Sequence, residues 1–335
     1  PGVNRSQAIK VLAGRRHGAM KRSGKSEHEL VFKELPTMLD AYKKFVGKRP
    51  GLEQPGAPLP DIGARLESYP LSRPKIDAYR EVCGIPRSKD YFIPLLYPQV
   101  LAGALHAQIF AHPKFPLQAA GLIHVGNTVT QHRPSRIYEP LSFEVKLRGT
   151  RPARKGHEFD LLTYAYVEDE LVWEASTTIL SPQRFSEEPE KTERRVLQAP
   201  EAPLLRSTTI EVLADQGRRY GGVSGDYNPI HLHALTAKLF GFKRAIAHGM
   251  WTLARTLAEV EDDMPADGRV FLEVGFKRPV YLPSTIVLNA SKRDDSLFLE
   301  ARAPRGDTLH LLANIHPLDQ VEESIASGEA RSEEE

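Results

Sequence analysis

An internal duplication is the feature that most constrains how this chain can fold. The segment Ile76–Ile85 can be laid over Leu213–Asp226 through the shared pattern Tyr-x-x-Val-x-Gly. Further on, Gly121–Val129 lies over Val270–Arg278 through a shared Val-Gly. Similarity that returns within one chain indicates that one structural unit occurs twice. We therefore expect two copies of one architecture.

Each copy repeats the same order of predicted elements: a strand, an irregular segment, a long helix and then antiparallel strands. The helices are apolar stretches with helical spacing, Tyr97–Phe110 in the first copy and Ile246–Val260 in the second. The strands that follow show alternating patterns at Leu141–Leu147, Asp160–Val167, Leu171–Leu180, Thr285–Ala290, Leu297–Ala301 and Leu309–Ile315. A single long apolar helix is best buried by a sheet that wraps around it. The sequence thus predicts an α+β protein with a double hot-dog fold, a pseudo-dimer within one chain, and leaves open a further homodimer.

The chain divides into five regions on this interpretation. We expect a partly helical basic extension over 1–60, a degenerate hot-dog unit over 61–182, a linker over 183–204, a catalytic hot-dog unit over 205–318 and a disordered acidic tail over 319–335. Within the extension, residues 28–47 have enough apolar positions for a short helix lying on the first unit.

Charge and composition narrow the class of protein. Residues 1–60 hold twelve Lys and Arg against five Asp and Glu, whereas the overall net charge is only +2. Such an arm either meets a polyanion or is a solvated extension, and the second is commoner, so no nucleic-acid partner is expected. No apolar run reaches the roughly 20 residues of a membrane span. The single cysteine, Cys83, excludes an internal disulfide and fits a cytoplasmic protein.

The two copies differ at one place that matters for chemistry. From Gly84 to Pro98, which pairs with His248, the first copy spans 14 positions, whereas the second spans 23 from Gly225 to His248. The nine extra residues include most of the run Asp226-Tyr-Asn-Pro-Ile-His231. The first copy has Ile85 at the position of Asp226, so only the second copy carries an acid and a base.

That acid and base lie five residues apart on a segment suited to hold them. The turn signal Asn228-Pro229 fixes the backbone between Asp226 and His231. Hydration of an α,β-unsaturated thioester removes one proton from water and delivers one to C2, which a carboxylate and an imidazole with tuned pKa values can do. The developing charge on the thioester oxygen needs a donor, which a helix-start N–H can supply.

The whole segment resembles the hydratase 2 motif of the MaoC-like (R)-specific enoyl-CoA hydratases. The resemblance covers Tyr220, the run Ser224-Gly-Asp-Tyr-Asn-Pro-Ile-His231 and Ala247-His-Gly-Met250. It implies that Asp226 and His231 are the catalytic dyad, that Asn228 orients the site, and that the Gly249 N–H stabilises the oxyanion. It also implies an acyl-CoA or acyl-carrier-protein thioester as substrate, no cofactor beyond that carrier and no metal.

Other residues of the segment have two interpretations each. His248 either contacts the substrate or caps the helix, and Ser224 is either a substrate contact or a turn residue. Lys243 and Arg244 could meet the phosphates of a CoA arm, although a solvated basic pair is the commoner outcome. His124 and His132 of the first copy have no acid at motif spacing and are expected to be structural.

Three functions compete. The first is reversible hydration of trans-2-enoyl-CoA to (3R)-3-hydroxyacyl-CoA, with 3-hydroxyacyl-carrier-protein dehydration as a close variant. The second is an acyl-thioester-binding protein without turnover. The third, a hot-dog thioesterase, is disfavoured because the helix starts with His-Gly-Met in place of a carboxylate. The first copy lacks the insertion, so we expect space for a long acyl chain there. Nothing in the motif requires either chain end.

Overall fold

The computed structural model describes residues 24–45, 49–54, 56–153, 155–183, 197–198 and 200–326. Its strands are β1 (His28–Phe32), β2 (Ile62–Tyr69), β3 (Ile123–Gln131), β4 (Leu141–Ala153), β5 (Gly156–Val167), β6 (Glu170–Pro182), β7 (Leu204–Val212), β8 (Val270–Phe276), β9 (Ser284–Arg293), β10 (Ser296–Arg302) and β11 (Leu309–Pro317). Its helices are α2 (Met38–Tyr42), α3 (Arg73–Cys83), α4 (Tyr97–Ala111), α5 (Gln216–Ser224), α6 (Pro229–Leu232), α7 (Ala234–Leu239), α8 (Gly249–Ala258), a 3₁₀ turn (Glu261–Asp263) and α9 (Leu318–Ala326).

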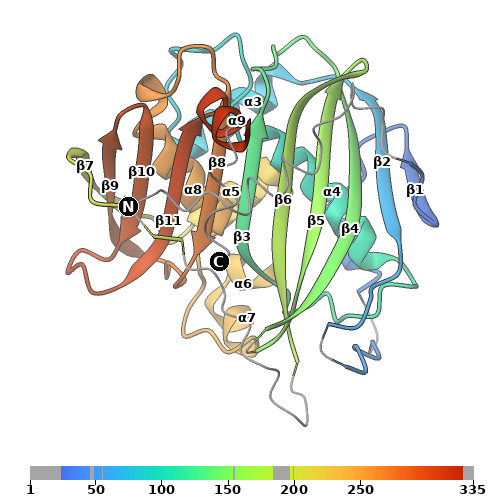
Figure 1. Cartoon of the computed structure of the whole chain (residues 1–335). Helices are drawn as coiled ribbons and strands as arrows, with labels where there is room; N and C mark the ends of the chain where they lie inside the picture. The colour runs from blue at the N-terminus through green and yellow to red at the C-terminus, as the bar shows by residue number, and fades with distance from the viewer. Residues whose placement is uncertain are drawn as a thin grey trace, which may run out of the picture.

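All the described strands belong to one sheet, ordered β1-β2-β4-β5-β6-β3-β8-β11-β10-β9-β7. The first unit contributes β2-β4-β5-β6-β3, and the second repeats that order as β7-β9-β10-β11-β8. Strands β3 and β8 join the units in antiparallel register, with Gly126 directly opposite Gly275. The two Val-Gly sequences thus meet at the join. The predicted α+β double hot-dog is confirmed (Figure 1).

The long apolar helices lie behind this sheet, one in each unit (Figure 1). Helix α4 is buried on nearly every side, so it lacks the polar stripe of a surface helix. Its buried polar side chains have partners: Gln99 Nε2 donates to Thr177 Oγ1 at 3.0 Å, and His106 Nε2 lies 2.9 Å from Thr163 Oγ1. Helix α8 begins later than predicted, at Gly249, because the preceding residues pair with an extended segment, where Ala247 N donates to Val280 O at 2.8 Å.

The segments expected to be irregular are helices, α3 and α5. Both end at a glycine in the left-handed region, Gly84 with φ of 65° and Gly225 with φ of 74°. The aligned tyrosines, Tyr79 and Tyr220, approach each other with ring centroids 6.3 Å apart. The glycines therefore terminate helices, and the repeated Tyr-x-x-Val-x-Gly pattern marks a helix end that occurs twice.

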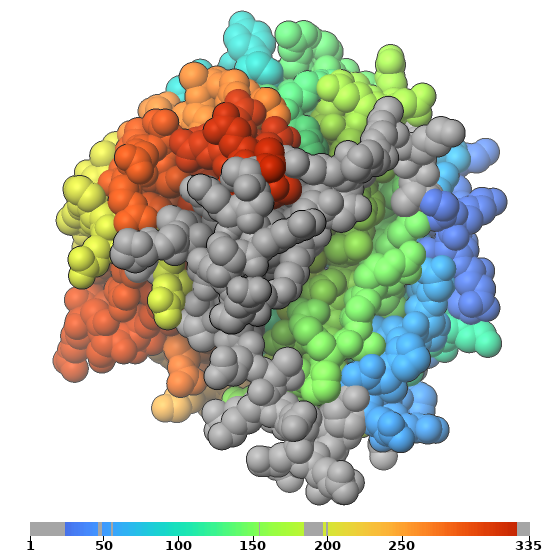
Figure 2. Space-filling model, viewed as in Figure 1, coloured from blue at the N-terminus to red at the C-terminus, as the bar shows by residue number. Residues whose placement is uncertain are grey.

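The short helix expected within residues 28–47 is present as α2 and packs on α4 of the first unit, but the segment before it is a strand. Residues His28–Phe32 form β1, which pairs in parallel with β2, and only Met38–Tyr42 are helical. A sheet edge offers unpaired backbone groups, which favours a strand there. The side chains of Val31 and Leu39, two of the apolar positions of this segment, are 53% and 55% exposed. Strands β1 and β7 are the two edges of the sheet and lie on opposite sides of the molecule (Figure 2). Much of the basic arm, residues 1–23, lies outside the described residues.

The acidic tail is not disordered throughout. Residues Leu318–Ala326 form α9, which lies on the face of the sheet away from α4 and α8 (Figure 1). Val321 is 1% exposed and packs with Phe271, while Arg269 forms ion pairs with Asp319 at 2.7 Å and Glu322 at 3.2 Å. Residues 327–335, and positions 184–196 and 199 of the expected linker, lie outside the described residues. Among the helices that are described, none has the length and apolar character needed to cross a membrane.

Candidate active site

The carboxylate of Asp226 is placed by the end of α5. Gly225 ends that helix, and Ser224 Oγ donates to Tyr220 O at 2.8 Å while it accepts from Asp226 N at 3.2 Å. Ser224 therefore serves the turn, one of its two interpretations. A glycine within α5 lets the next loop pack closely: a Cβ on Gly217 would lie 1.8 Å from His231 O.

The turn Asn228-Pro229 places His231 on the short helix α6. Asn228 N donates to Asp226 Oδ1 at 3.0 Å, and its side-chain oxygen accepts from Ile230 N, which makes Asn228 the N-cap of α6. His231 Nδ1 lies 2.8 Å from Ile246 O. A carbonyl oxygen only accepts, so Nδ1 carries the hydrogen and Nε2 has a free lone pair. Asn228 thus orients both members of the dyad.

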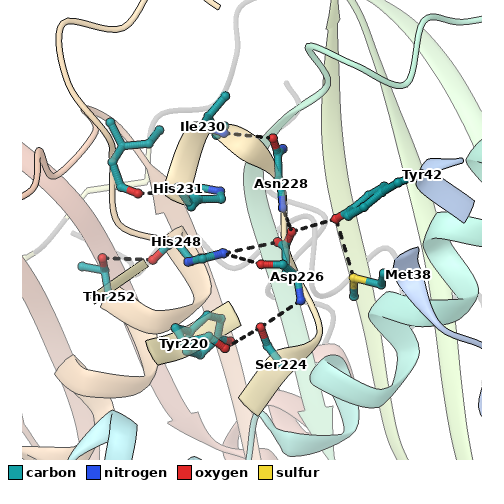
Figure 3. A network of polar contacts seen from close by, with 11 residues as sticks. Met38, Tyr42, Tyr220, Ser224, Asp226, Asn228, Ile230, His231, His248 and Thr252 are labelled. Carbon is teal, nitrogen blue, oxygen red and sulfur yellow. Dashed lines mark hydrogen bonds and ion pairs between the residues drawn. The ribbon is translucent and has the colours of Figure 1, made fainter. Parts of the chain in front are cut away.

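His248 lies directly beside the dyad (Figure 3). It is the N-cap residue of α8, yet its side chain makes no capping hydrogen bond. Its Nε2 donates to Asp226 O at 3.0 Å, and its ring stacks on that of His231 with centroids 3.7 Å apart. Burial lowers the pKa of His248 to about 3, so the ring is neutral at physiological pH. His248 holds the loop of Asp226 rather than capping α8.

The electrostatics of the dyad favour an ionised acid beside a neutral base. Burial opposes ionisation of Asp226, but the imidazoles of His248 and His231 and the hydrogen bonds that Asp226 accepts outweigh it, so the pKa of Asp226 lies below its ordinary value. Burial also lowers the pKa of His231, and the Asp226 charge offsets this only in part. A carboxylate oxygen and an imidazole nitrogen of these residues lie within 4.8 Å of each other.

Two residues near the dyad were not predicted from the sequence. Tyr42 of α2 donates its hydroxyl to Asp226 Oδ1 at 2.9 Å, although α2 belongs to the N-terminal extension that the motif did not require. His124 of β3, expected to be structural, feels the charge of Asp226 and packs edge-on against Phe276 at 4.9 Å, and burial lowers its pKa to about 4. Neither residue stands at a spacing that links it to the motif, so no sequence signal could have found them.

The remaining predicted residues lie around the start of α8. Gly249 is the first residue of that helix, where backbone N–H groups have no partner within the helix. A Cβ on Gly249 would lie 3.0 Å from Phe276 Cε1, so a larger residue would crowd this ring. The guanidinium of Arg244 lies 5.7 Å from the ring centroid of Tyr281 and donates to Pro283 O, and Lys243 is exposed. The structure thus favours a surface role for Arg244.

Asp226, His231 and His248 are also close enough together to be considered as metal ligands. However, His248 Nε2 donates to a carbonyl oxygen, so in the neutral ring this nitrogen carries the hydrogen and has no lone pair for a metal. That the site uses no metal or cofactor stays a prediction.

The first unit has no such dyad at the equivalent place. Ile85 follows the Gly84 cap, where Asp226 follows Gly225, and it packs against the hydrophobic core. Leu96 occupies the N-cap of α4, where His248 occupies that of α8. His132 of this unit lies 3.3 Å from Glu174 of the adjacent strand β6.

Comparison with known proteins agrees with this geometry. The sequence model of the protein family described as MaoC like domain matches residues 195–303 of this chain. The chain is 34% identical over 263 residues to 3-hydroxyacyl-thioester dehydratase X of Mycobacterium tuberculosis (strain ATCC 25618 / H37Rv), covering 78% of this chain and 91% of that protein. The crystal structure of HtdX of Mycobacterium tuberculosis aligns with a TM-score of 0.65 and 31% identity, over 76% of this chain and 98% of that one. A MaoC-like dehydratase from Phytophthora capsici, 17% identical, shares the fold with a TM-score of 0.63, over 77% and 94% of the two chains.

Proposed function

Since this chain belongs to the MaoC-like dehydratase family, we propose that it catalyses the reversible hydration of trans-2-enoyl thioesters to (3R)-3-hydroxyacyl thioesters. The observation that carries the proposal is the pairing of Asp226 with His231 on one turn, with the hydrogen of His231 held on Nδ1 by Ile246 O. The relative named a 3-hydroxyacyl-thioester dehydratase supports the same reaction in the reverse direction.

The dyad can hold and orient the attacking water. An ionised Asp226 and the unprotonated Nε2 of His231 are both acceptors. Two hydrogen bonds of about 2.8 Å to one water span up to roughly 5 Å, enough to join a carboxylate oxygen and an imidazole nitrogen that lie within 4.8 Å of each other. A water between them donates both of its hydrogens to the dyad, so its lone pairs point away, toward C3 of a bound enoyl thioester.

The reaction then needs one proton to move and one charge to be stabilised. As the water oxygen bonds to C3, the dyad takes one of its protons and delivers a proton to C2 on the same face. The thioester oxygen carries the negative charge in between, and the N–H of Gly249 at the start of α8 is the group that we assign to it. Catalysis by acid and base alone requires no cofactor beyond the thioester carrier.

The carrier is either CoA or an acyl-carrier protein, as in a step of fatty-acid metabolism in the cytoplasm. Lys243, exposed on the segment between α7 and α8, remains our candidate for the carrier phosphates. The alternative, an acyl-thioester-binding protein without turnover, is disfavoured because Asp226 and His231 keep the protonation states that the chemistry requires.

The test is direct. Purified protein is mixed with crotonyl-CoA and with the matching acyl-carrier-protein thioester, and loss of enoyl-thioester absorbance is followed by chiral analysis of the product. We expect (3R)-3-hydroxybutyryl thioester. A (3S) product, or binding without absorbance change on either carrier, would refute the proposal.

A further inference from the structure

Helix α2 brings a residue of the N-terminal extension into the candidate site, across 184 positions of sequence. The hydroxyl of Tyr42 donates to Asp226 Oδ1 at 2.9 Å, and Asn228 N donates to the same oxygen at 3.0 Å (Figure 3). The other oxygen, Oδ2, faces His248, whose Nε2 is 3.8 Å away. One carboxylate oxygen is thus held by two donors, and the second lies toward the imidazole of His248.

The position of Tyr42 is fixed from outside the site, by the central helix of the first unit. Ala41 is fully buried against Ala107 and Ala111 of α4. Met38 lies over α4 so closely that a Cβ on Gly103 would come 2.5 Å from Met38 Cε. Gln108 Nε2 of α4 donates to Thr37 O at 3.1 Å, just before α2 begins. Since α4 is buried on nearly every side, it provides a fixed surface on which α2 and its tyrosine pack.

We propose that Tyr42 is a positioning residue of the active site, which fixes the orientation of the Asp226 carboxylate so that Oδ2 is the oxygen presented to the reacting water. The inference rests on the proposed function, since only a catalytic Asp226 makes its orientation matter. It also gives the first unit a part in catalysis, because α4 of that unit is what seats Tyr42.

The charge environment sets the direction of the expected pH effect. The titratable groups that act on Asp226 or feel its charge come from five elements: Tyr42, His124, Tyr220, His231 and His248. Burial and the neighbouring carboxylate raise the pKa of Tyr42 above its ordinary value, so its hydroxyl keeps its proton and donates at every pH of interest. That donated bond stabilises the charged form of Asp226 and lowers its pKa. Removing it raises the pKa of Asp226.

The variant Tyr42→Phe removes the donor and keeps the ring, which packs edge-on against Phe45 at 5.3 Å. Because a hydrogen bond to a charged group is strong, we expect kcat to fall about tenfold or more, with KM changed less than about twofold. The acid limb of the kcat/KM profile should move to higher pH, and the melting temperature should fall slightly, because the buried carboxylate loses one hydrogen bond. Tyr91→Phe, at a tyrosine that is 73% exposed, is the matched control and should leave all four quantities unchanged.

A second measurement separates this inference from the proposed function. Carboxyl carbons of ¹³C-labelled aspartate are titrated by NMR in the full-length wild type and in Tyr42→Phe, and Asp226→Asn identifies the signal. A higher Asp226 pKa in Tyr42→Phe supports the contact even if the wild type has no turnover, an outcome that would sink the proposed function alone. An unchanged Asp226 pKa, or wild-type kcat and pH profile in Tyr42→Phe, overturns the role of Tyr42.

Discussion

His231 has one ring nitrogen bound to Ile246 O at 2.8 Å, which leaves the other as the atom that can exchange a proton. Asp226 has the corresponding arrangement, with Oδ1 held by two donors and Oδ2 toward the imidazole of His248. Both side chains are therefore oriented before any substrate binds, which is what general acid–base catalysis requires.

Substitution of either dyad residue should remove this chemistry and keep the fold. We expect Asp226→Asn and His231→Gln each to lower kcat at least about a hundredfold, as for a positioned acid or base. Circular dichroism and melting temperature should change little, since both side chains keep similar shapes. Asp307→Asn, at an exposed turn residue of the same unit, serves as the control. Turnover within severalfold of the wild type in either dyad variant would mean that its residue is not catalytic.

The pH dependence follows from two lowered pKa values. The pKa of Asp226 and that of His231 both lie below their ordinary values of 3.8 and 6.5. Activity needs an ionised carboxylate and a neutral imidazole, so it should fall only when the pH drops low enough to protonate them. We expect kcat/KM for crotonyl-CoA to be retained as the pH is lowered through about 6.5, where an unperturbed histidine would already titrate. An acid limb centred at or above that pH would contradict the assignment of His231 as the neutral partner.

At the residue scale, the sequence predicted what lies within one contiguous segment. The spacing of Asp226, Asn228 and His231 is short and interrupted by a proline, so it specifies a local geometry that needs little from the rest of the fold. Tyr42 could not be predicted in this way, because its place beside Asp226 depends on how α2 packs on α4. His248 had two interpretations, and the packing of its ring on His231 decided against the cap.

Among the elements, the packing of α6 on α5 is what holds His231 near Asp226. The contact is close enough that a Cβ on Gly217 would overlap the carbonyl oxygen of His231, at 1.8 Å, whereas a Cβ on Gly222 of the same helix would meet nothing within 4 Å. We expect Gly217→Ala to displace α6 and lower kcat at least about tenfold, because misplacement of a catalytic group by about 1 Å is costly. Gly222→Ala is the matched control, and it should keep activity and slightly raise the melting temperature, since alanine favours a helix by about 1 kcal/mol over glycine. Equal activity in the two variants would show that the α5–α6 contact is not needed.

The position of helix α2 changes the acyl chain length that we expect the site to accept. The lack of an insertion in the first unit predicted space for a long acyl chain, but Tyr42 contacts Asp226 and Met38 lies closely over Gly103 of α4 on that side. We therefore expect kcat/KM to stop rising beyond chains of about four to six carbons, although each buried methylene could otherwise add about 0.8 kcal/mol.

The substitution Met38→Ala removes side-chain volume from this region. It should raise kcat/KM for enoyl-CoA substrates of about eight to twelve carbons relative to crotonyl-CoA, at about fourfold for each methylene newly accommodated. Leu39→Ala, at the 55% exposed neighbour on the same helix, should leave the ratio unchanged. A wild type that already prefers long chains would contradict the idea that α2 closes this space.

At the element scale, hydrophobic periodicity predicted the elements whose own apolar residues form the core, namely α4 and the strands around it. It did not predict β1 or α9, which are short and depend on partners elsewhere, and the short helix expected within 28–47 was predicted without its bounds, Met38–Tyr42. Strand β1 exists because β2 has a free edge, and α9 exists because Val321 and Ile325 reach Phe271 on the sheet. A polar, acidic segment such as 319–326 gives little sign of such a contact in its own sequence.

The molecule as a whole is built on one sheet and one continuous core. Strands β3 and β8 pair across the join from Gly126 and Gly275 to Gln131 and Val270, and the main hydrophobic cluster draws residues from both units. The duplicated order of elements was enough to predict this architecture. Nothing in the motif pointed to residues 1–60, whereas the structure places Tyr42 of that region in contact with Asp226.

A shared core should make unfolding of the two units a single event. Scanning calorimetry is expected to show one transition, with equal calorimetric and van't Hoff enthalpies, as for a cooperative domain. Units that unfolded independently would give two resolved transitions or a calorimetric enthalpy well above the van't Hoff value. That result would contradict the inference that the pairing of β3 with β8 makes the two units unfold together.

Only one of the two units carries the dyad, and this difference affects how the sequence of such a protein can evolve. In a pair of identical subunits, every substitution appears at both sites, so a residue can be altered only if both roles tolerate it. Here the halves lie in one chain, and each position is inherited separately. The unit with Ile85 at the place of Asp226 therefore does not need to keep catalytic residues. Its central helix, α4, can instead hold α2 beside the dyad of the other unit. Fusion allows one half to vary in shape while the other keeps its chemistry.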